Sequence, residues 1–337
     1  MREMQRIYLQ KTEAIEFGFY QNKTDFIVEE IPLKQFGQKG NYLILHVEKV
    51  ELTTWDMIAA FAAFLNIEAQ KIGYAGLKDK HATTSQYISI ERKFQRELKR
   101  FKHPQIKILE SFFDTNSLQM GDLYGNRFRI NLYDIDDIKA GRIEKQIRKI
   151  EKNGMANYFG FQRFGRDADA IEQAKAMVEG ELFVTDAKLK KFLLSVYQSE
   201  RFNSWLFERI SLSKDAEFGL FEGDVYLKDS KLVTPKEIPT KEFRAKRVIP
   251  TGLLCGRNVF RARYKAREIE KKYDDEYFVE KGSRREAIVY PQNIQTLYKR
   301  EFGVLQLSFE LPKAAYATVF LENISGRNLN AGDVKKS

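Results

Sequence analysis

The chain has very little cysteine and no long apolar run. Cys255 is the single cysteine among 337 residues, so no internal disulfide can form and a reducing, cytosolic compartment is favoured. We expect Cys255 to be a small buried residue. No stretch approaches the ~20 apolar residues that span a bilayer, and the first residues lack the apolar region of a signal peptide. These absences predict a soluble, cytoplasmic protein.

Metal-binding and nucleotide-binding motifs are missing as well. Only His46, His81 and His103 occur, without a cysteine pair or an H-x-E motif, which excludes a zinc-dependent base deaminase. Neither the GxxxxGK[ST] loop of P-loop NTPases nor the GxGxxG fingerprint of dinucleotide-binding folds is present. Any chemistry must therefore come from side chains alone.

The charge balance is strongly basic. Lys and Arg number 57 against 47 Asp and Glu, a formal net charge of +10, which favours a polyanionic partner. The 26 Phe and 16 Tyr can stack on bases, although most should lie in a core. The stretch 244–285 is the most basic, and we interpret it either as a solvated face or as a phosphate-binding surface.

The length favours two domains, with a single large α/β domain as the alternative, and hydrophobic periodicity predicts the elements. Capping signals place some of the helix ends. In chain order, we predict a central strand at 41–47, a helix from Thr53 with a capping box to Asp56, a short strand at 86–90, a helix at 91–102, a half-buried strand at 125–132, a helix at 137–152 that Gly154 ends, mostly helical sequence from 166 to 246, a strand at 305–311 and a helix at 314–324.

Asp79 is the only carboxylate in residues 73–86, GYAGLKDKHATTSQ. Lys78 and Lys80 flank it and should favour its charged form. Small and hydroxyl residues around it let a ligand approach the backbone, so the loop suits a nucleophile that meets a polyanion. The alternative is a solvated turn in which Asp79 pairs with its neighbouring lysines.

Residues 157–165, NYFGFQRFG, alternate glycine, aromatic and polar side chains. An Asn can hydrogen-bond a pyrimidine edge while a Phe stacks on its face, as in the recognition of flipped bases. The alternative is a glycine-bent core segment that buries Phe159, Phe161 and Phe164. Phe26 lies on a predicted strand, where a core position is the favoured interpretation.

Together, GYAGLKDKHATTSQ and NYFGFQRFG resemble the two defining motifs of the TruD family of tRNA pseudouridine synthases. The resemblance spans nearly the whole chain. Two departures are Tyr20, where the family often has lysine, and residues 117–119, where it usually has basic residues. Further matches are TDFIVEE around Phe26, GNRF from Gly125, IPTGLLCG from Ile249 and LPKAAYAT from Leu311.

The resemblance implies isomerisation of a uridine in the D-arm of tRNA, position 13, to pseudouridine, with no cofactor and no metal. It implies that Asp79 is the catalytic aspartate and that Phe26, Asn157 and Phe159 line the pocket for the target base. The partner would be tRNA, without a membrane or a nucleotide cofactor, and we expect a monomer. The further substrate-binding residues predicted from the two motifs are Lys78, Lys80, Gln86 and Arg163.

The implied fold class is α+β. It combines a pseudouridine-synthase-type catalytic domain, with a mixed, mostly antiparallel sheet flanked by helices, and an inserted α/β domain across a basic cleft. The predicted boundaries are 1–182 for the first part of the catalytic domain, 183–303 for the insert and 304–337 for the final strand and helix.

Two other functions stay open from the residues. A non-catalytic RNA-binding protein needs only the basic surface and the aromatic rings, and a glycosidase would cleave the base and release it. Within the isomerase hypothesis, a carboxylate can attack C1′, attack C6 of the base, or remove the 2′ proton. The sequence does not choose among these steps.

Overall fold

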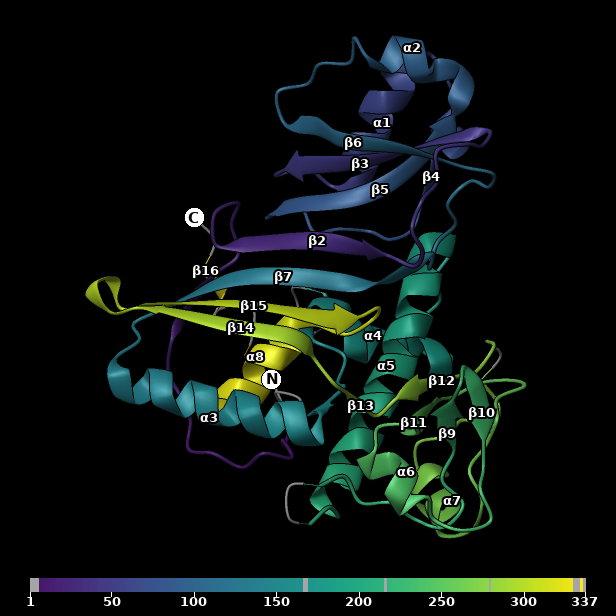
Figure 1. Cartoon of the computed structure of the whole chain (residues 1–337). Coiled ribbons are helices and arrows are strands. Elements are labelled where there is room, and N and C mark those ends of the chain that lie inside the picture. The colour runs from purple at the N-terminus through teal and green to yellow at the C-terminus, as the bar shows by residue number, and fades with distance from the viewer. Residues whose placement is uncertain (1–5, 166–168, 215–216, 279, 330–333, 336–337) are drawn as a thin grey trace. The chain divides into compact units, whose positions relative to one another are not determined.

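The computed structural model describes residues 6–165, 169–214, 217–278, 280–329 and 334–335. Contacts divide the chain into two compact units (Figure 1). The predicted domain boundaries at 182 and 303 follow from the family resemblance rather than from compactness, and they stay predictions. Unit 1 comprises Met1–Glu16, Gly141–Pro291 and Ala315–Gly332, and unit 2 comprises Phe17–Ala140, Gln292–Ala314 and Asp333–Ser337.

Unit 2 is built on a ten-stranded sheet. Its strands are β1 (Gly18–Tyr20), β2 (Phe26–Pro32), β3 (Tyr42–Val50), β4 (Gly73–Tyr74), β5 (Thr83–Glu91), β6 (Ile106–Asp114), β7 (Leu123–Tyr133), β14 (Gln292–Lys299), β15 (Val304–Pro312) and β16 (Val334–Lys335). The main order is β14-β15-β7-β2-β5-β3-β6. The β2–β5 and β1–β16 pairs are parallel and the other pairs are antiparallel. The predicted mixed, mostly antiparallel sheet is thus confirmed.

Strand β7 follows its predicted alternation. Phe128, Ile130 and Leu132 are buried, while Arg127 and Arg129 are exposed, because successive side chains point to opposite faces of a sheet. Figure 1 shows β15, from the end of the chain, lying beside β7. The predicted strands at 41–47 and 305–311 are also confirmed, and the strand at 86–90 extends over Thr83–Glu91.

Helix α1 (Thr54–Leu65) covers the β3 end of the sheet. Thr53 is its N-cap, and its side chain and that of Asp56 form the predicted capping box, which satisfies two helix-end N–H groups. Met57 and Phe61 pack into one apolar cluster with strand residues such as Leu43. Another helix, α3 (Asp137–Asn153), ends as predicted at Gly154, whose positive φ of 78° suits glycine.

The predicted helix at 91–102 is wrong over most of its length. Strand β5 continues to Glu91, which pairs with Tyr42, and a 3-10 turn, η2 (Arg92–Phe94), and a four-residue helix, α2 (Gln95–Leu98), follow. Glu91, the first residue of the predicted helix, thus belongs to strand β5 because it pairs with β3. The predicted helix at 314–324 begins later, as α8 (Ala317–Ser325).

Unit 1 is mostly helical around two small sheets. Trp205, Phe202 and Tyr158 are fully buried in its core. Two three-residue strands, β9 (Tyr226–Lys228) and β10 (Lys231–Val233), interrupt the predicted helical stretch 166–246. The remaining elements are β8 (Met155–Ala156), η3 (Phe161–Phe164), α4 (Asp169–Glu179), α5 (Ala187–Ser211), β9 (Tyr226–Lys228), β10 (Lys231–Val233), α6 (Thr240–Arg244), β11 (Ile249–Leu254), α7 (Tyr264–Glu270), β12 (Ser283–Glu286) and β13 (Ile288–Val289).

In the described chain, five of the thirteen cations of the basic stretch 244–285 are paired with carboxylates inside unit 1. Arg284, for example, contacts Glu270, and both side chains are nearly fully buried. Internal pairing leaves such groups unavailable to a phosphate. The other printed pairs are Arg244 with Glu217, Arg261 and Arg267 with Asp274, Arg267 with Glu270 and with Glu276, and Lys272 with Glu208.

Cys255 is buried, as predicted, and burial raises the pKa of its thiol to about 12. Within the described ranges, no helix has both the length and the apolar character needed to cross a bilayer. The same residues contain no group of three or more His, Cys, Asp or Glu side chains that could hold a metal ion.

Candidate active site

Asp79 lies on a loop of unit 2 between β4 and β5. The chain enters this loop through β4, at whose first residue, Gly73, a β-carbon would lie 2.4 Å from the Leu118 carbonyl oxygen and from the Ser89 and Ser117 hydroxyls. Only glycine allows so close an approach of two chain segments. Ser117, one of the departures from the family pattern, is hydrogen-bonded here to Ser89, at 2.9 Å between the hydroxyl oxygens.

A buried chain of hydrogen bonds holds the first half of this loop. The Lys78 backbone N–H donates to the Thr54 hydroxyl at 2.9 Å, and that hydroxyl donates to Oε1 of Gln86 at 2.9 Å. Nε2 of Gln86 donates back to the Gly76 carbonyl at 3.2 Å. Gln86 is fully buried, so these contacts make it a support of the loop.

Lys78 and Lys80, the two neighbours of Asp79, differ sharply. The Lys78 ammonium forms a buried ion pair with Glu30, with 2.6 Å between Nζ and Oε2. Lys80 is exposed. Lys78 is therefore committed to Glu30, and only Lys80 offers a solvent-accessible charge.

Lys49, at the end of β3, was not anticipated from the sequence. Its side chain is fully buried, and Nζ donates to the Leu52 carbonyl at 2.5 Å and to the Asp79 carbonyl at 3.0 Å. Within the described chain, no carboxylate forms an ion pair with it. Burial lowers the pKa of Lys49 to about 8, and Asp79 is the main influence that raises it. The feature of the sequence that could have identified Lys49 is its position on the apolar face of a strand.

The pKa of Asp79 is raised, against the expectation that flanking lysines would lower it. Desolvation is the largest cause, and Lys49, Lys78 and His81 oppose it. By its accessible surface Asp79 is an exposed residue, yet the protein atoms packed around its carboxyl group displace enough water for desolvation to dominate its pKa. Lys80 is not among the causes. The charged groups that lower the pKa of Asp79 include Lys49, which is distant from it in the sequence.

Phe26 begins β2 next to the end of the loop. The parallel pairing of Ile27 with Thr83 places it there, and the Thr83 hydroxyl donates to the Lys23 carbonyl at 2.7 Å. Phe26 is 3% exposed and packs against Phe19 and Phe128. The core interpretation of its ring is thus confirmed.

Asn157, in unit 1, is buried and its carboxamide is engaged at both ends. Nδ2 donates to the Glu286 carbonyl at 2.9 Å, and Oδ1 accepts from Nη2 of Arg285 at 2.8 Å. Its backbone N–H donates to the Ala287 carbonyl. These bonds determine which way the amide points.

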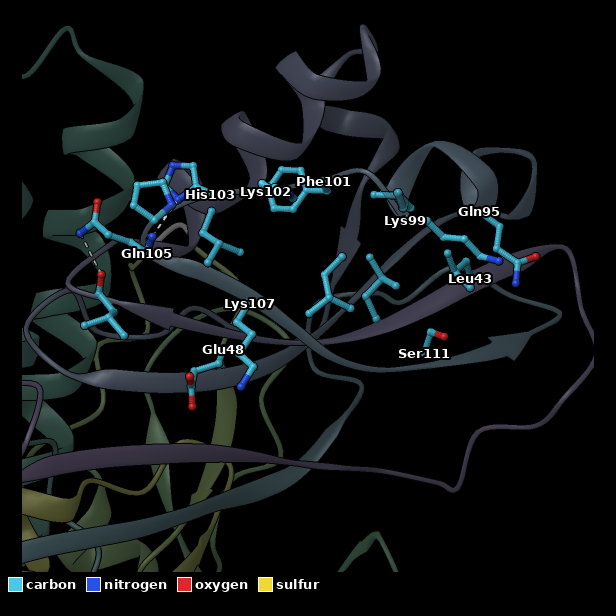
Figure 2. A pocket seen from close by; sticks show the side chains of 16 residues that line it. Leu43, Glu48, Gln95, Lys99, Phe101, Lys102, His103, Gln105, Lys107 and Ser111 are labelled. Carbon is cyan, nitrogen blue, oxygen red and sulfur yellow. Dashed lines mark hydrogen bonds between the residues drawn. The ribbon is translucent and has the colours of Figure 1, made fainter.

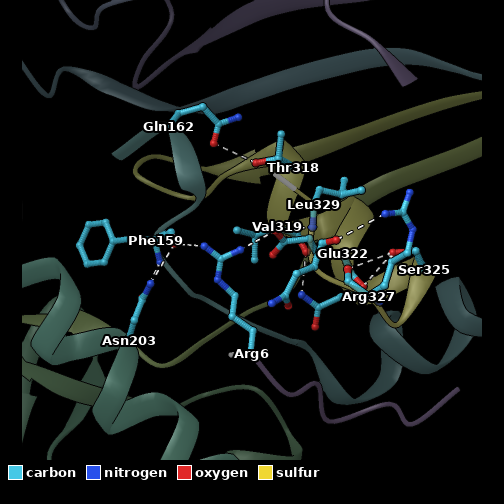
Figure 3. A network of polar contacts seen from close by, with 12 residues as sticks. Arg6, Phe159, Gln162, Asn203, Thr318, Val319, Glu322, Ser325, Arg327 and Leu329 are labelled. Atoms are coloured by element: carbon cyan, nitrogen blue, oxygen red, sulfur yellow. Dashed lines mark hydrogen bonds and ion pairs between the residues drawn. The ribbon is translucent and has the colours of Figure 1, made fainter. Parts of the chain in front are cut away.

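Phe159 is 8% exposed and is held through its backbone and its ring. Asn203 accepts from its N–H at 2.8 Å and donates to its carbonyl at 3.0 Å, and Arg6 also donates to that carbonyl (Figure 3). The Arg285 guanidinium lies 3.9 Å from the ring centroid and that of Arg163 lies 5.7 Å away. The aromatic ring therefore has a strongly cationic environment.

Arg285 is the second residue that sequence reasoning missed. It lies in the stretch interpreted as a surface, but it is 8% exposed, and burial lowers its pKa to about 10. No carboxylate pairs with it in the described ranges. Arg163 donates through Nε to the Ser199 hydroxyl at 3.0 Å.

The predicted site residues thus form two groups. Lys78, Asp79, Lys80 and Gln86 share one loop and strand of unit 2, with Phe26 at the neighbouring strand. Asn157, Phe159 and Arg163 share one short segment of unit 1.

Comparisons with known proteins agree along the chain. A family model described as tRNA pseudouridine synthase D (TruD) matches residues 4–184 and 169–324. The chain is 38% identical to a tRNA pseudouridine synthase D from Nitratiruptor sp., over 97% of this chain and 99% of that protein. It is 36% identical to one from Sulfurimonas denitrificans, over 97% and 100%. A crystal structure of a protein from Methanosarcina mazei, titled as a TruD protein, has a similar fold, with a TM-score of 0.74 and 22% identity over 98% of this chain and 97% of that one.

Proposed function

Because the chain belongs to the TruD family of tRNA pseudouridine synthases, we propose that it isomerises uridine 13 in the D-arm of tRNA, with Asp79 as the catalytic carboxylate. The observation that carries this proposal is the construction of the Asp79 loop. The carboxylate of Asp79, an exposed residue whose pKa the surrounding protein raises, stands on a loop whose backbone is fixed by a buried ammonium, a buried glutamine and a helix N-terminal threonine. A solvated surface turn has no need of such supports.

The reaction breaks the N1–C1′ bond, turns the uracil and joins C1′ to C5. The C5 proton is lost to solvent and N1 gains a proton, so nothing is oxidised and nothing leaves. An ionised Asp79 can act by any of the three steps described above, each of which needs the carboxylate deprotonated. A desolvated carboxylate is also a stronger nucleophile or base than a hydrated one, because its raised pKa reflects a less stabilised charge.

We propose that Lys49 is a positioning residue. It donates to the backbone carbonyl of Asp79, and its charge opposes the rise in the carboxyl pKa. Lys49 thereby fixes the residue and helps to keep it ionised near neutral pH.

Recognition of the target base is proposed for Asn157 and Phe159. Oδ1 of Asn157 accepts one hydrogen bond from Arg285 and keeps a second lone pair, which can accept from N3–H of uracil. Phe159 supplies an aromatic face or edge for an extruded base. Phe26 has a supporting role beside the Asp79 loop, and Lys80 and Arg163 are the charged groups proposed for phosphate contacts.

The proposal is tested with tRNA labelled with tritium at C5 of uridine. Isomerisation releases tritium to water, a glycosidase releases free uracil, and a non-catalytic RNA-binding protein does neither. Asp79→Asn should abolish tritium release and leave tRNA affinity within a few-fold of wild type. Glu68→Gln is the matched control, since Glu68 is an exposed carboxylate of the same unit.

Near-normal tritium release by Asp79→Asn would disprove the role of Asp79. Mass spectrometry of nuclease fragments locates the product, and pseudouridine at another position would disprove the assignment to position 13 alone. We also propose that the enzyme acts as a monomer in the cytoplasm, where tRNA is modified. Sedimentation of the free protein tests the first part, and a dimer would contradict it.

A further inference from the structure

A groove on unit 2 combines an apolar floor with a cationic rim. It is a cavity of about 720 Å³ between β3, β6 and the chain that follows α2. Leu43, Leu98 and Ile106 contribute to the floor. Figure 2 shows Lys99 and Lys107 among the side chains that line it, and Lys102 lines it as well.

Residues 92–107, which form one side of the groove, are strongly basic. Glu97 is the only acidic residue in this stretch. Lys93 pairs with Glu91, and Arg92 lies over the Phe113 ring. In the described chain none of the other five cations forms an ion pair within 4.0 Å: Arg96, Lys99, Arg100, Lys102 and Lys107. Lys107 faces Glu48 across the β3–β6 register but does not reach it as an ion pair.

The stretch 244–285 is mixed in this respect. Carboxylates of unit 1 pair with Arg244, Arg261, Arg267, Lys272 and Arg284, while other cations there form no ion pair in the described chain. Unpaired, exposed cations attract a polyanion more strongly than paired ones do, because no internal contact has to be broken. The groove of unit 2, with its unpaired cations beside an apolar floor, is therefore a suitable surface for a sugar-phosphate backbone.

The loop that carries the lysines is held in place. Phe101 stacks on Phe61 with 4.2 Å between ring centroids. The Gln105 backbone N–H donates to Nδ1 of His103 at 3.2 Å, and Nε2 of Gln105 donates to the Val50 carbonyl at 3.0 Å. An acceptor at Nδ1 leaves the proton of the neutral imidazole on Nε2, as a donor for a phosphate or a ribose hydroxyl. A fixed loop also loses little entropy on binding.

Strand β3 connects the groove to the Asp79 loop. The groove lining follows this strand from Leu43 to Val50, and Lys49, whose Nζ contacts the Asp79 carbonyl, is the chain neighbour of Val50. From Leu43 to Lys49, six residues of extended strand span ~20 Å, at roughly 3.4 Å per residue. An RNA strand that presents a nucleotide to Asp79 can therefore reach the groove with nucleotides several positions away.

We infer that the groove bounded by Lys99, Lys102 and Lys107 binds the sugar-phosphate backbone of the substrate tRNA at nucleotides away from the target uridine. The three lysines contact phosphate groups, and the apolar floor of the groove accommodates the ribose rings. The inference rests on the proposed function, because tRNA is the substrate in both. Contacts of this kind increase affinity without reading sequence.

The test compares two triple variants with the same change in net charge. Lys99→Gln, Lys102→Gln and Lys107→Gln are combined in one, and the exposed lysines Lys39, Lys71 and Lys145 are replaced by Gln in the control. At about 0.15 M salt, the groove variant should bind tRNA at least ~10-fold more weakly, and the control should change by less than about threefold. The slope of log affinity against log salt should fall by about two to three in the groove variant.

Tritium release at saturating enzyme should be unchanged in the groove variant, because in the described chain none of the three lysines forms a hydrogen bond or ion pair with Asp79 or Lys49. Equal losses of affinity in the two triple variants, or none in the groove variant, would overturn the inference. Absence of tritium release from the wild type would instead disprove the proposed function. The two proposals can be separated because the groove is tested by tRNA affinity, which does not depend on isomerisation. If the groove triple variant melts at a lower temperature, the three single variants are compared with wild type in the same binding assay.

Discussion

We predict that Lys49→Met lowers the rate of isomerisation about 100-fold while unit 2 stays folded. Two effects on stability oppose each other. Burial of the charge, with its pKa lowered from 10.5 to about 8, costs about 3 kcal/mol at neutral pH, and methionine removes that cost. The carbonyls of Leu52 and Asp79 then lose their donor, at about 1–3 kcal/mol each. The net change in the free energy of unfolding should be within about 2 kcal/mol.

The loss of activity has a different origin. Without Lys49, nothing in the described chain donates to the Asp79 carbonyl, and a misplacement of ~1 Å can cost about 100-fold in rate. Single-turnover tritium release at saturating enzyme measures this step directly. Lys71→Met, at an exposed lysine of the same unit, is the control and should keep the wild-type rate.

The pH dependence of stability gives an independent readout of Lys49. Its pKa is lower in the folded chain than in the unfolded chain, so between the two values the unfolded chain binds more protons. The free energy of unfolding therefore rises with pH in this window. From about pH 7.5 to about pH 9.5 the contribution of Lys49 should be an increase of ~2 kcal/mol, below the range in which tyrosines titrate. Urea denaturation of Lys49→Met should lack this increase.

Three results would count against this reasoning. A wild-type rate in Lys49→Met would show that the contact with Asp79 does not position the carboxylate. The same pH slope of stability in Lys49→Met and in wild type would show that Lys49 is not the buried titrating group. A large loss of stability that accounts for the lost activity would reduce Lys49 to a structural residue.

The remaining predictions concern the pH profile and Arg285. Because desolvation raises the pKa of Asp79, the acid limb of single-turnover tritium release should lie at higher pH than an ordinary aspartate gives, and a limb at or below the ordinary value would contradict the proposal. An alkaline limb near pH 8 is expected from deprotonation of Lys49, whose pKa is about 8. Arg285→Lys should lower kcat/KM about 10- to 100-fold, since lysine cannot both stack on Phe159 and bond Asn157. The control is Lys265→Arg, at an exposed cation of unit 1. An unchanged kcat/KM in Arg285→Lys would show that Arg285 has no role in base recognition.

Local patterns in the sequence were sufficient for much of the fold. The alternation over 125–132, the capping box of Thr53 and the glycine that ends α3 depend on neighbouring residues, so the sequence reports them directly. The helix predicted at 91–102 loses its first residue to the pairing of β5 with β3, a long-range contact that periodicity does not contain. The start of α8 was shifted for a local reason, since Ala314 has a positive φ of 65°, which a right-handed helix does not allow.

The sequence by itself determined the family and pointed to Asp79, because motif identity and order are carried by the chain alone. Only the tertiary structure decided the environment of that carboxylate. Lys49 is 30 residues away from Asp79, Arg285 is 128 residues away from Asn157, and neither contact has a local signature. Desolvation depends on all the atoms around a group, so it reversed the pKa shift that the flanking lysines of Asp79 had suggested.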